Sequence, residues 1–168
     1  MQGEMNFTIE GGHPLSGIVE TSRSKNGAVA LLAAALLNRG RTTLEHMPKI
    51  EEVKRLIEVL RSIGVGVEMQ DTSVVITPPA LFSLDAINQG AAAQTRSILM
   101  FIGPLLHHFE FDAFDLPRSG GCTLGIRSVR PHQMALEKFG VTIEVRPDSY
   151  HIQHEGLRPT EVILYESS

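Results

Sequence analysis

The first eighty residues alternate between apolar stretches of helical period and of strand period. The segment Lys25–Leu37 (KNGAVALLAAALL) is rich in Ala and Leu and apolar on nearly every side, which predicts a buried helix. A second helix is predicted over Ile50–Ile63, because its apolar residues recur every three or four positions and line one face. Gly64 is typical of the residue that ends such a helix. Two short strands, Val65–Met69 and Ser73–Thr77, are expected next.

The same order of elements returns in the second half of the chain. The pattern predicts a helix, a strand, a helix and two strands, over Thr95–Phe109, Glu110–Asp115, Pro131–Phe139, Val141–Val145 and Ser149–Gln153. The first set likewise has a short strand, Arg41–Met47, between its helices. The register agrees too, because Gly64–Val65 recurs as Gly140–Val141, 76 residues later (140 minus 64). The sequence therefore predicts an α/β fold with two βαβαββ repeat units, at about residues 15–80 and 88–156.

A third unit is expected to begin at residues 157–168. The segment Thr160–Ser168 (TEVILYESS) is similar to Ser16–Ser22 (SGIVETS), a predicted strand that leads into the first helix. Because a repeat unit buries its apolar face against its neighbours, we expect these 168 residues to be part of a longer protein. A unit with an uncovered edge would be prone to self-association.

Composition and charge narrow the expected partners. With 42% hydrophobic and 20% charged residues, the chain has an ordinary globular composition. The formal net charge of −4 argues against nucleic-acid binding, so any anion site must be local. The longest apolar run, Ala28–Leu37, is too short to span a membrane, and Met1–Glu10 is unlike a signal peptide, so a cytoplasmic location without membrane contact is expected. One cysteine is too few for a disulfide or a thiolate zinc cage, and no pattern requires a cofactor.

The segment Leu116–His132 (LPRSGGCTLGIRSVRPH) is the most informative for chemistry. Its glycine pair, Gly120–Gly121, frees the backbone to present amide donors, while Arg127 and Arg130 bring positive charge near Cys122. Such surroundings stabilise a thiolate, which indicates an anion cradle around a reactive thiol. A small cysteine that only fills space in a turn is equally compatible with this loop.

Two further cations precede predicted helices. Lys25, followed by Asn26, stands where a strand is expected to end and a helix to begin, and a helix N-terminus suits a phosphate group. Arg96 takes the equivalent place in the second unit. Solvated surface residues would fit both places as well. Four histidines are predicted to be solvated or structural: His107, His108, His151 and His154.

Together these segments resemble the enolpyruvyl transferase family along essentially the whole chain. The similar segments are SRSKN at Ser22–Asn26, MPKIEEV at Met47–Val53, RSILMFIGPLL at Arg96–Leu106, GGCTLGIR at Gly120–Arg127 and LEKFGVTIE at Leu136–Glu144. The most specific of them is the glycine pair with its cysteine and downstream arginine. The resemblance implies repeated βαβαββ units in an inside-out α/β barrel with the helices inside, here incomplete.

The resemblance also implies a reaction. The enolpyruvyl group of phosphoenolpyruvate would move to the 3-hydroxyl of UDP-N-acetylglucosamine, with release of phosphate and without a cofactor. By position, Lys25 and Asn26 bind phosphoenolpyruvate, Arg96 meets the substrates, and Cys122 is the catalytic cysteine, assisted by Lys25. The segment expected along the nucleotide sugar consists of Arg127, Ser128, Val129, Arg130 and Pro131.

The chain departs from the family pattern between Pro117 and the glycine pair, where Arg118 and Ser119 are inserted, and at Arg130, which stands in place of an acid. Both departures leave the acceptor open. One alternative is an enzyme that uses 3-phosphoshikimate, although that relative does not use the cysteine. The other is a non-catalytic ligand-binding or regulatory paralogue. Because a catalytic aspartate and a further substrate arginine belong to the family's second half, the isolated 168 residues are expected to be inactive.

Overall fold

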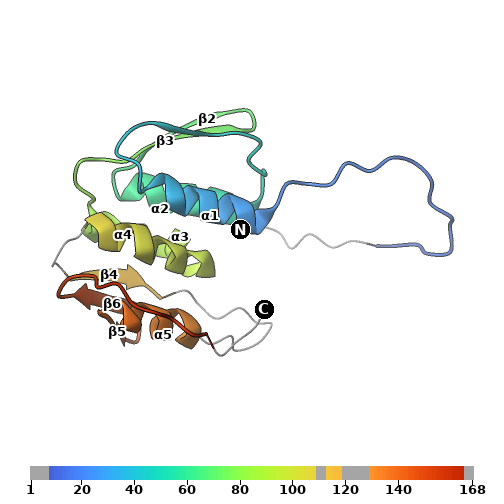
Figure 1. Ribbon diagram of the computed structural model, residues 1–168. Helices are drawn as coiled ribbons and strands as arrows, with labels where there is room; N and C mark the ends of the chain where they lie inside the picture. Colours follow the sequence, from blue (N-terminus) through green and yellow to red (C-terminus); the bar gives the residue numbers. More distant parts are fainter. Residues whose placement is uncertain (1–7, 109–112, 119–128, 165–168) are drawn as a thin grey trace.

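The computed structural model describes residues 8–108, 113–118 and 129–164 of the chain. It contains two small antiparallel sheets with helices between them, so the predicted α/β class is confirmed (Figure 1). The elements of the first half are α1 (Lys25–Ala35), β1 (Thr42–Leu44), α2 (Glu51–Ser62), β2 (Gly66–Gln70) and β3 (Ser73–Thr77). Those that follow are η1 (Leu84–Ala86), α3 (Gln89–Ala93), η2 (Arg96–Phe101), α4 (Ile102–His108), β4 (Phe114–Pro117), α5 (Arg130–Lys138), β5 (Val141–Val145) and β6 (Ser149–His154).

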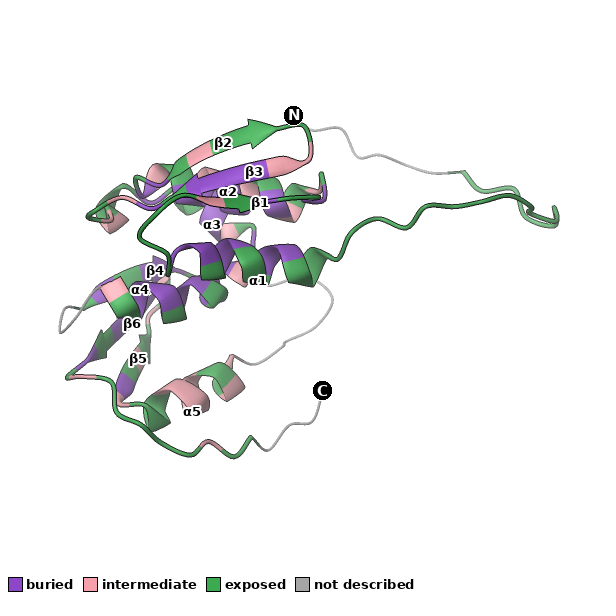
Figure 2. Cartoon of the chain, turned by 45° about the horizontal axis from the view of Figure 1, so that its top comes forward, coloured by how far each residue is buried: buried purple, intermediate pink, exposed green. Residues whose placement is uncertain are grey.

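The apolar faces of the helices form a core between the sheets. Helices α1 to α4 lie between the sheet β1–β3–β2 and the sheet β4–β6–β5 (Figure 1). Leu32 of α1 and Leu56 of α2 are fully buried, as are Ile76 of β3 and Ile152 of β6. Figure 2 shows the buried residues on the sides of the helices that face one another. One hydrophobic cluster therefore runs through both halves of the fold.

The two hairpins of the fold share one register. In the first hairpin Val67 of β2 pairs with Ile76 of β3, and in the second Ile143 of β5 pairs with Ile152 of β6. Each residue of the second hairpin lies 76 positions after its counterpart, as the sequence predicts (143 minus 67, 152 minus 76). The limits of the repeat units themselves stay a prediction.

The strand outside the hairpin in each sheet, β1 or β4, departs from this spacing. Thr42 of β1 pairs with Ile76, whereas Phe114 of β4 pairs with Ile152, so β4 lies only 72 positions after β1 (114 minus 42). Residues 45–50 separate β1 from α2, but residues 118–129 separate β4 from α5. The longer connection holds the glycine pair and Cys122. The second unit therefore has extra chain at the place where the sequence predicts chemistry.

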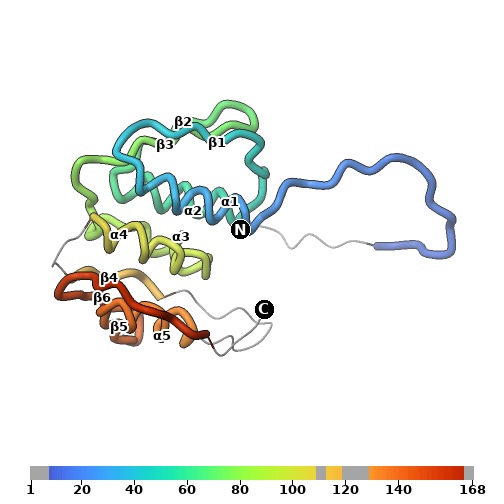
Figure 3. The backbone as a smooth tube through the Cα atoms, viewed as in Figure 1, coloured from blue at the N-terminus to red at the C-terminus, as the bar shows by residue number. Residues whose placement is uncertain are grey.

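Several predicted elements differ from the structure, among them the strand expected at Glu110–Asp115, which is described as β4 over Phe114–Pro117. The strand expected at Ser16–Ser22 is wrong, because residues 8–24 run away from the two sheets without a strand partner (Figure 3), and Ile18 is 97% exposed. Its apparent counterpart is also not a strand over residues 160–164; the rest, residues 165–168, lies outside the described part. The helix expected at Thr95–Phe109 begins as the 3₁₀ turn η2 and continues as α4. Pro104, in the first turn of α4, has no N–H to offer an α-helix that would start earlier, which explains the change.

No helix within the described ranges is long and apolar enough to cross a membrane.

Candidate functional site

Lys25 and Asn26 begin helix α1 and are exposed. The helix starts there because the Ser24 side chain accepts a hydrogen bond from the Gly27 N–H at 3.1 Å, a typical N-cap. No acidic residue lies in this first turn. Lys25 thus adds a full positive charge to the positive end of a helix dipole, an arrangement that favours a bound anion.

Arg96 opens η2 and is half-buried. The residue before it, Thr95, is only 1% exposed, and its hydroxyl accepts a hydrogen bond from the Ser97 N–H at 3.2 Å. This cap fixes the turn that carries Arg96. The second candidate cation therefore stands on a well-defined stretch of backbone.

The Glu52 carboxylate is hydrogen-bonded to the turn that carries Arg96. The Thr95 and Ser97 hydroxyls each donate a hydrogen bond of 2.5 Å to Oε1 of Glu52, in the first turn of α2. Burial of Glu52 raises its pKa, but the hydrogen bonds from Ser97 and Thr95 and the charge of Lys25 outweigh burial, so the pKa lies below its ordinary value of 4.5. Glu52 is therefore ionised at neutral pH, and the charge of Lys25 favours this ionised form.

The N-terminal ends of α1, α2 and η2 consequently meet at one end of the molecule. Lys25 opens α1 and Arg96 opens η2, 71 positions later in the chain (96 minus 25); Glu52 is bonded to the Arg96 turn, and the charge of Lys25 lowers its pKa. Sequence reasoning missed Glu52. The available signal was the pair of hydroxyl residues on either side of Arg96, since both need an acceptor when they are buried.

The segment predicted to lie along a nucleotide sugar is described only in its second half. Val129 is half-buried against the core, and Arg130 and Pro131 open helix α5, which packs on β5. Proline suits the first turn of a helix, where its missing N–H leaves no bond unmade. Cys122, Arg127 and Ser128 lie outside the described residues, so their place beside Lys25 and Arg96 stays a prediction.

The predicted structural histidines have partners within the fold. His108 Nε2 lies 2.6 Å from the Leu36 carbonyl oxygen, which ties α4 to the end of α1. His151 Nδ1 lies 3.0 Å from the Asp115 carboxylate on the neighbouring strand. In the part of the chain that the structure describes, no three His, Cys, Asp or Glu side chains group in a way that could hold a metal.

An open hollow of about 800 Å³ lies elsewhere, at β5 and β6. Its lining residues are Ala113, Gly140, Thr142, Gln153, His154, Glu155, Gly156 and Arg158. None of them is a predicted site residue.

Comparison with known proteins defines the family to which this chain belongs. The family model described as EPSP synthase (3-phosphoshikimate 1-carboxyvinyltransferase) matches residues 9–167. The chain therefore belongs to the EPSP synthase family, a family of enolpyruvyl transferases.

Among its relatives, a UDP-N-acetylglucosamine 1-carboxyvinyltransferase of Cellvibrio japonicus is 33% identical over 150 residues, which is 89% of this chain and 35% of the relative. UDP-N-acetylglucosamine 1-carboxyvinyltransferase 2 of Bacillus subtilis is 31% identical over 158 residues, 94% of this chain and 36% of the relative. The crystal structure of the enolpyruvyl transferase NikO from Streptomyces tendae has a similar fold, with a TM-score of 0.65 and 23% identity over 89% of this chain and 32% of that one. The chain thus spans about a third of the length of these relatives.

Proposed function

We propose that this chain forms the phosphoenolpyruvate-binding portion of an enolpyruvyl transferase whose acceptor is UDP-N-acetylglucosamine. The observation that carries the proposal is the tie between the Arg96 turn and Glu52 of α2, together with the charge of Lys25, which lowers the pKa of the Glu52 carboxyl from the start of α1. A chain of net charge −4 has no general attraction for anions, so a local pair of cations at helix N-termini is where a phosphate and a carboxylate would be held.

In the proposed site, each residue has a distinct task toward the donor. Lys25 and Asn26 bind phosphoenolpyruvate at the first turn of α1, and Arg96 meets its second anionic group. Arg127 adds a further charge from the segment after Cys122. Donors aimed at the charge that develops in the transition state are worth roughly 3–4 kcal/mol each.

The proposed chemistry is an addition followed by an elimination. The Cys122 thiol donates its proton to the methylene carbon of phosphoenolpyruvate, and the acceptor hydroxyl oxygen forms a bond to the neighbouring carbon. The hydroxyl proton leaves to a base, and the product is a tetrahedral intermediate that still carries the phosphate. Loss of a proton from the new methyl group and departure of phosphate then restore the double bond, now on the acceptor. The thiol recovers a proton at the end of the cycle.

The choice of acceptor rests on the relatives, which are named for UDP-N-acetylglucosamine. We propose that the segment from Arg127 through Pro131 lies along this nucleotide sugar, as the start of a helix offers N–H groups to a phosphate. A second candidate acceptor is 3-phosphoshikimate, because the matching family model carries the name of that enzyme. Cys122 favours the first acceptor, since the relative that uses 3-phosphoshikimate does not use this cysteine.

The experiment that tests this function measures alkylation of the chain by fosfomycin, an epoxide with a phosphonate group. Cys122 is the only cysteine, so a mass increase of the intact chain reports on that thiol alone. We expect fosfomycin to react with Cys122 and phosphoenolpyruvate to slow the reaction. Lys25→Ala should slow alkylation by fosfomycin but leave alkylation by the uncharged reagent iodoacetamide unchanged, because only the former needs a cation.

Lys49→Ala is the matched control, since Lys49 is also an exposed lysine but pairs with Asp71 at 2.7 Å, outside the proposed site. Equal effects of the two lysine variants on fosfomycin alkylation would contradict the proposed anion site. A folded chain whose Cys122 reacts with iodoacetamide but never with fosfomycin would contradict the proposed chemistry. Saturation-transfer NMR with UDP-N-acetylglucosamine and with 3-phosphoshikimate then separates the two acceptors.

A further inference from the structure

Glu52, in the first turn of α2, is an acidic side chain that joins α2 to the start of η2 by hydrogen bonds. Its Oε1 atom accepts bonds from both hydroxyls that flank Arg96, those of Thr95 and Ser97. The Thr95 hydroxyl also accepts a hydrogen bond from the Ser97 N–H, so this hydroxyl acts both as a donor, to Glu52, and as an acceptor. The carboxylate is thereby held to the turn that carries Arg96.

The other cation of the site, Lys25, acts on Glu52 through its charge. The Lys25 ammonium is near enough to contribute to the lowered pKa of the Glu52 carboxyl. The formal charges of Lys25, Arg96 and Glu52 add up to one positive charge.

We propose that Glu52 is a positioning residue of the anion site: its carboxylate fixes the turn that carries Arg96 to the first turn of α2. This inference rests on the proposed function, because it takes Lys25 and Arg96 as ligands of phosphoenolpyruvate. Glu52 itself touches no substrate. It acts through Arg96, whose place relative to Lys25 must suit the phosphate and the carboxylate of one small molecule.

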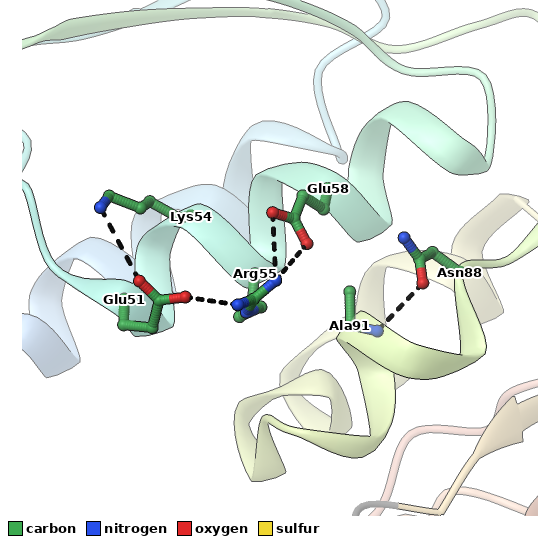
Figure 4. Close-up of polar contacts among 6 residues, drawn as sticks. All are labelled: Glu51, Lys54, Arg55, Glu58, Asn88 and Ala91. Carbon is green, nitrogen blue, oxygen red and sulfur yellow. Dashed lines mark hydrogen bonds and ion pairs between the residues drawn. The ribbon is translucent and has the colours of Figure 1, made fainter. Parts of the chain in front are cut away.

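The neighbouring residue Glu51 offers a matched charge control. Its carboxylate pairs with Lys54 at 3.7 Å and with Arg55 at 2.6 Å along the exposed side of α2, as Figure 4 shows. Glu51→Gln therefore removes one negative charge, one position away, without touching the tie to η2.

Ser62 offers a matched structural control at the other end of α2. Its Oγ accepts a hydrogen bond of 2.9 Å from the Asn88 N–H. The Asn88 side chain in turn caps α3 by accepting a hydrogen bond from the Ala91 N–H, as Figure 4 shows. Ser62→Ala removes a tie between α2 and the following segment, as Glu52→Ala does, but far from Lys25 along the helix. A loss of stability alone is thus separable from a loss of positioning.

The test measures the dissociation constant of phosphoenolpyruvate for the 168-residue chain and its variants, by NMR titration of labelled protein. Glu52→Ala should weaken binding about tenfold, which corresponds to roughly 1.4 kcal/mol. Ser97→Ala, which removes one of the two bonds from the other side, should act in the same direction and more weakly. Glu52→Gln should recover most of the affinity lost in Glu52→Ala, because an amide oxygen can accept both hydroxyl bonds.

The outcomes separate the inference from the function on which it rests. Binding by Glu52→Ala as tight as that of the unsubstituted chain would overturn the inference alone, as would equal losses in Glu52→Ala and Ser62→Ala. Equal losses in Glu52→Ala, Glu52→Gln and Glu51→Gln would mean that charge matters and position does not, which also overturns it. If the unsubstituted, folded chain does not bind phosphoenolpyruvate, the proposed function fails and the inference fails with it.

Discussion

Replacing Gly64 by alanine tests the helix ending that both halves of the fold share. Gly64 follows α2 with a φ of 92°, and Gly140 follows α5 with a φ of 94°. In this left-handed region a Cβ atom lies too close to the following carbonyl oxygen, which costs roughly 1–2 kcal/mol. An added Cβ at Gly64 would lie 3.7 Å from Pro79 Cγ, an ordinary contact, so backbone strain is the main cost there.

The two glycines differ in their surroundings, which sets the order of the effects. Alanine also restricts the unfolded chain, which offsets ~0.4–1 kcal/mol of the strain, so Gly64→Ala should lower the free energy of unfolding by about 1 kcal/mol. At Gly140 an added Cβ would lie 3.3 Å from the Gly156 carbonyl oxygen, a tight contact with backbone. We therefore expect Gly140→Ala to cost more than Gly64→Ala.

Gly103 supplies the control, because it lies inside α4 with nothing within 4 Å of an added Cβ. Gly103→Ala should raise the free energy of unfolding by about 0.5–1 kcal/mol, since alanine is the better helix former. Urea unfolding followed by circular dichroism measures all three variants, and a change of ~1 kcal/mol should move the melting temperature by about 2–4 °C for a chain of this size. If Gly64→Ala stabilises the protein as Gly103→Ala does, the strain argument and the shared helix ending are refuted.

Three further predictions concern packing, capping and pH. Leu56→Ala empties a fully buried position of α2 and should cost about 2–5 kcal/mol in the same urea titration, and a cost below ~1 kcal/mol would contradict the described core. Ser24→Ala removes the N-cap of α1 and should cost ~0.5–2 kcal/mol, while Ser24→Thr keeps most of the stability; equal losses in the two would show that the hydroxyl is not the cap. Because folding lowers the Glu52 pKa, its ionised form adds stability above pH 4.5, and this contribution is lost as the pH falls through the lowered folded pKa. The stability difference between the unsubstituted chain and Glu52→Gln should therefore shrink on acidification, and a difference that stays constant from pH 7 to pH 3 would contradict the assignment.

Much of the local structure could be predicted from the sequence because it depends on short-range pattern. Helices α1 and α2 are confirmed, since their apolar residues recur at helical spacing and Gly64 ends the second. The 76-residue spacing of the hairpins could be read for the same reason: a glycine with positive φ followed by alternating residues leaves a pattern. The shift of β4 to a spacing of 72 could not, because a strand of four residues contains too little pattern to fix its register.

The strand at Ser16–Ser22 was a wrong prediction for a physical reason. Alternation shows that a segment can present one apolar face, but a strand forms only where another strand offers hydrogen-bonding groups. Within the described residues this segment has no such neighbour, and Ile18 and Val19 stay exposed. Local pattern contains no information about that partner.

The candidate site was only partly predictable. Lys25 and Arg96 could be singled out because each lies at the start of a helix, whereas the tie between the Arg96 turn and α2 follows from tertiary packing rather than from sequence distance. Glu52 was not singled out, since one of two adjacent glutamates in a first turn is ordinarily a solvated side chain that favours the helix dipole. Its importance appears only when Thr95 and Ser97 are placed against it.

Binding of phosphoenolpyruvate at the starts of α1 and η2 is tested most directly by mapping the amide chemical-shift changes of the ¹⁵N-labelled chain during titration with phosphoenolpyruvate. We expect the largest changes on Lys25, Asn26 and Arg96, together with the glycine–cysteine segment at residues 120–127. Changes confined to the hollow around Gly140 and Arg158, with none at the N-termini of α1 and η2, would contradict this expectation.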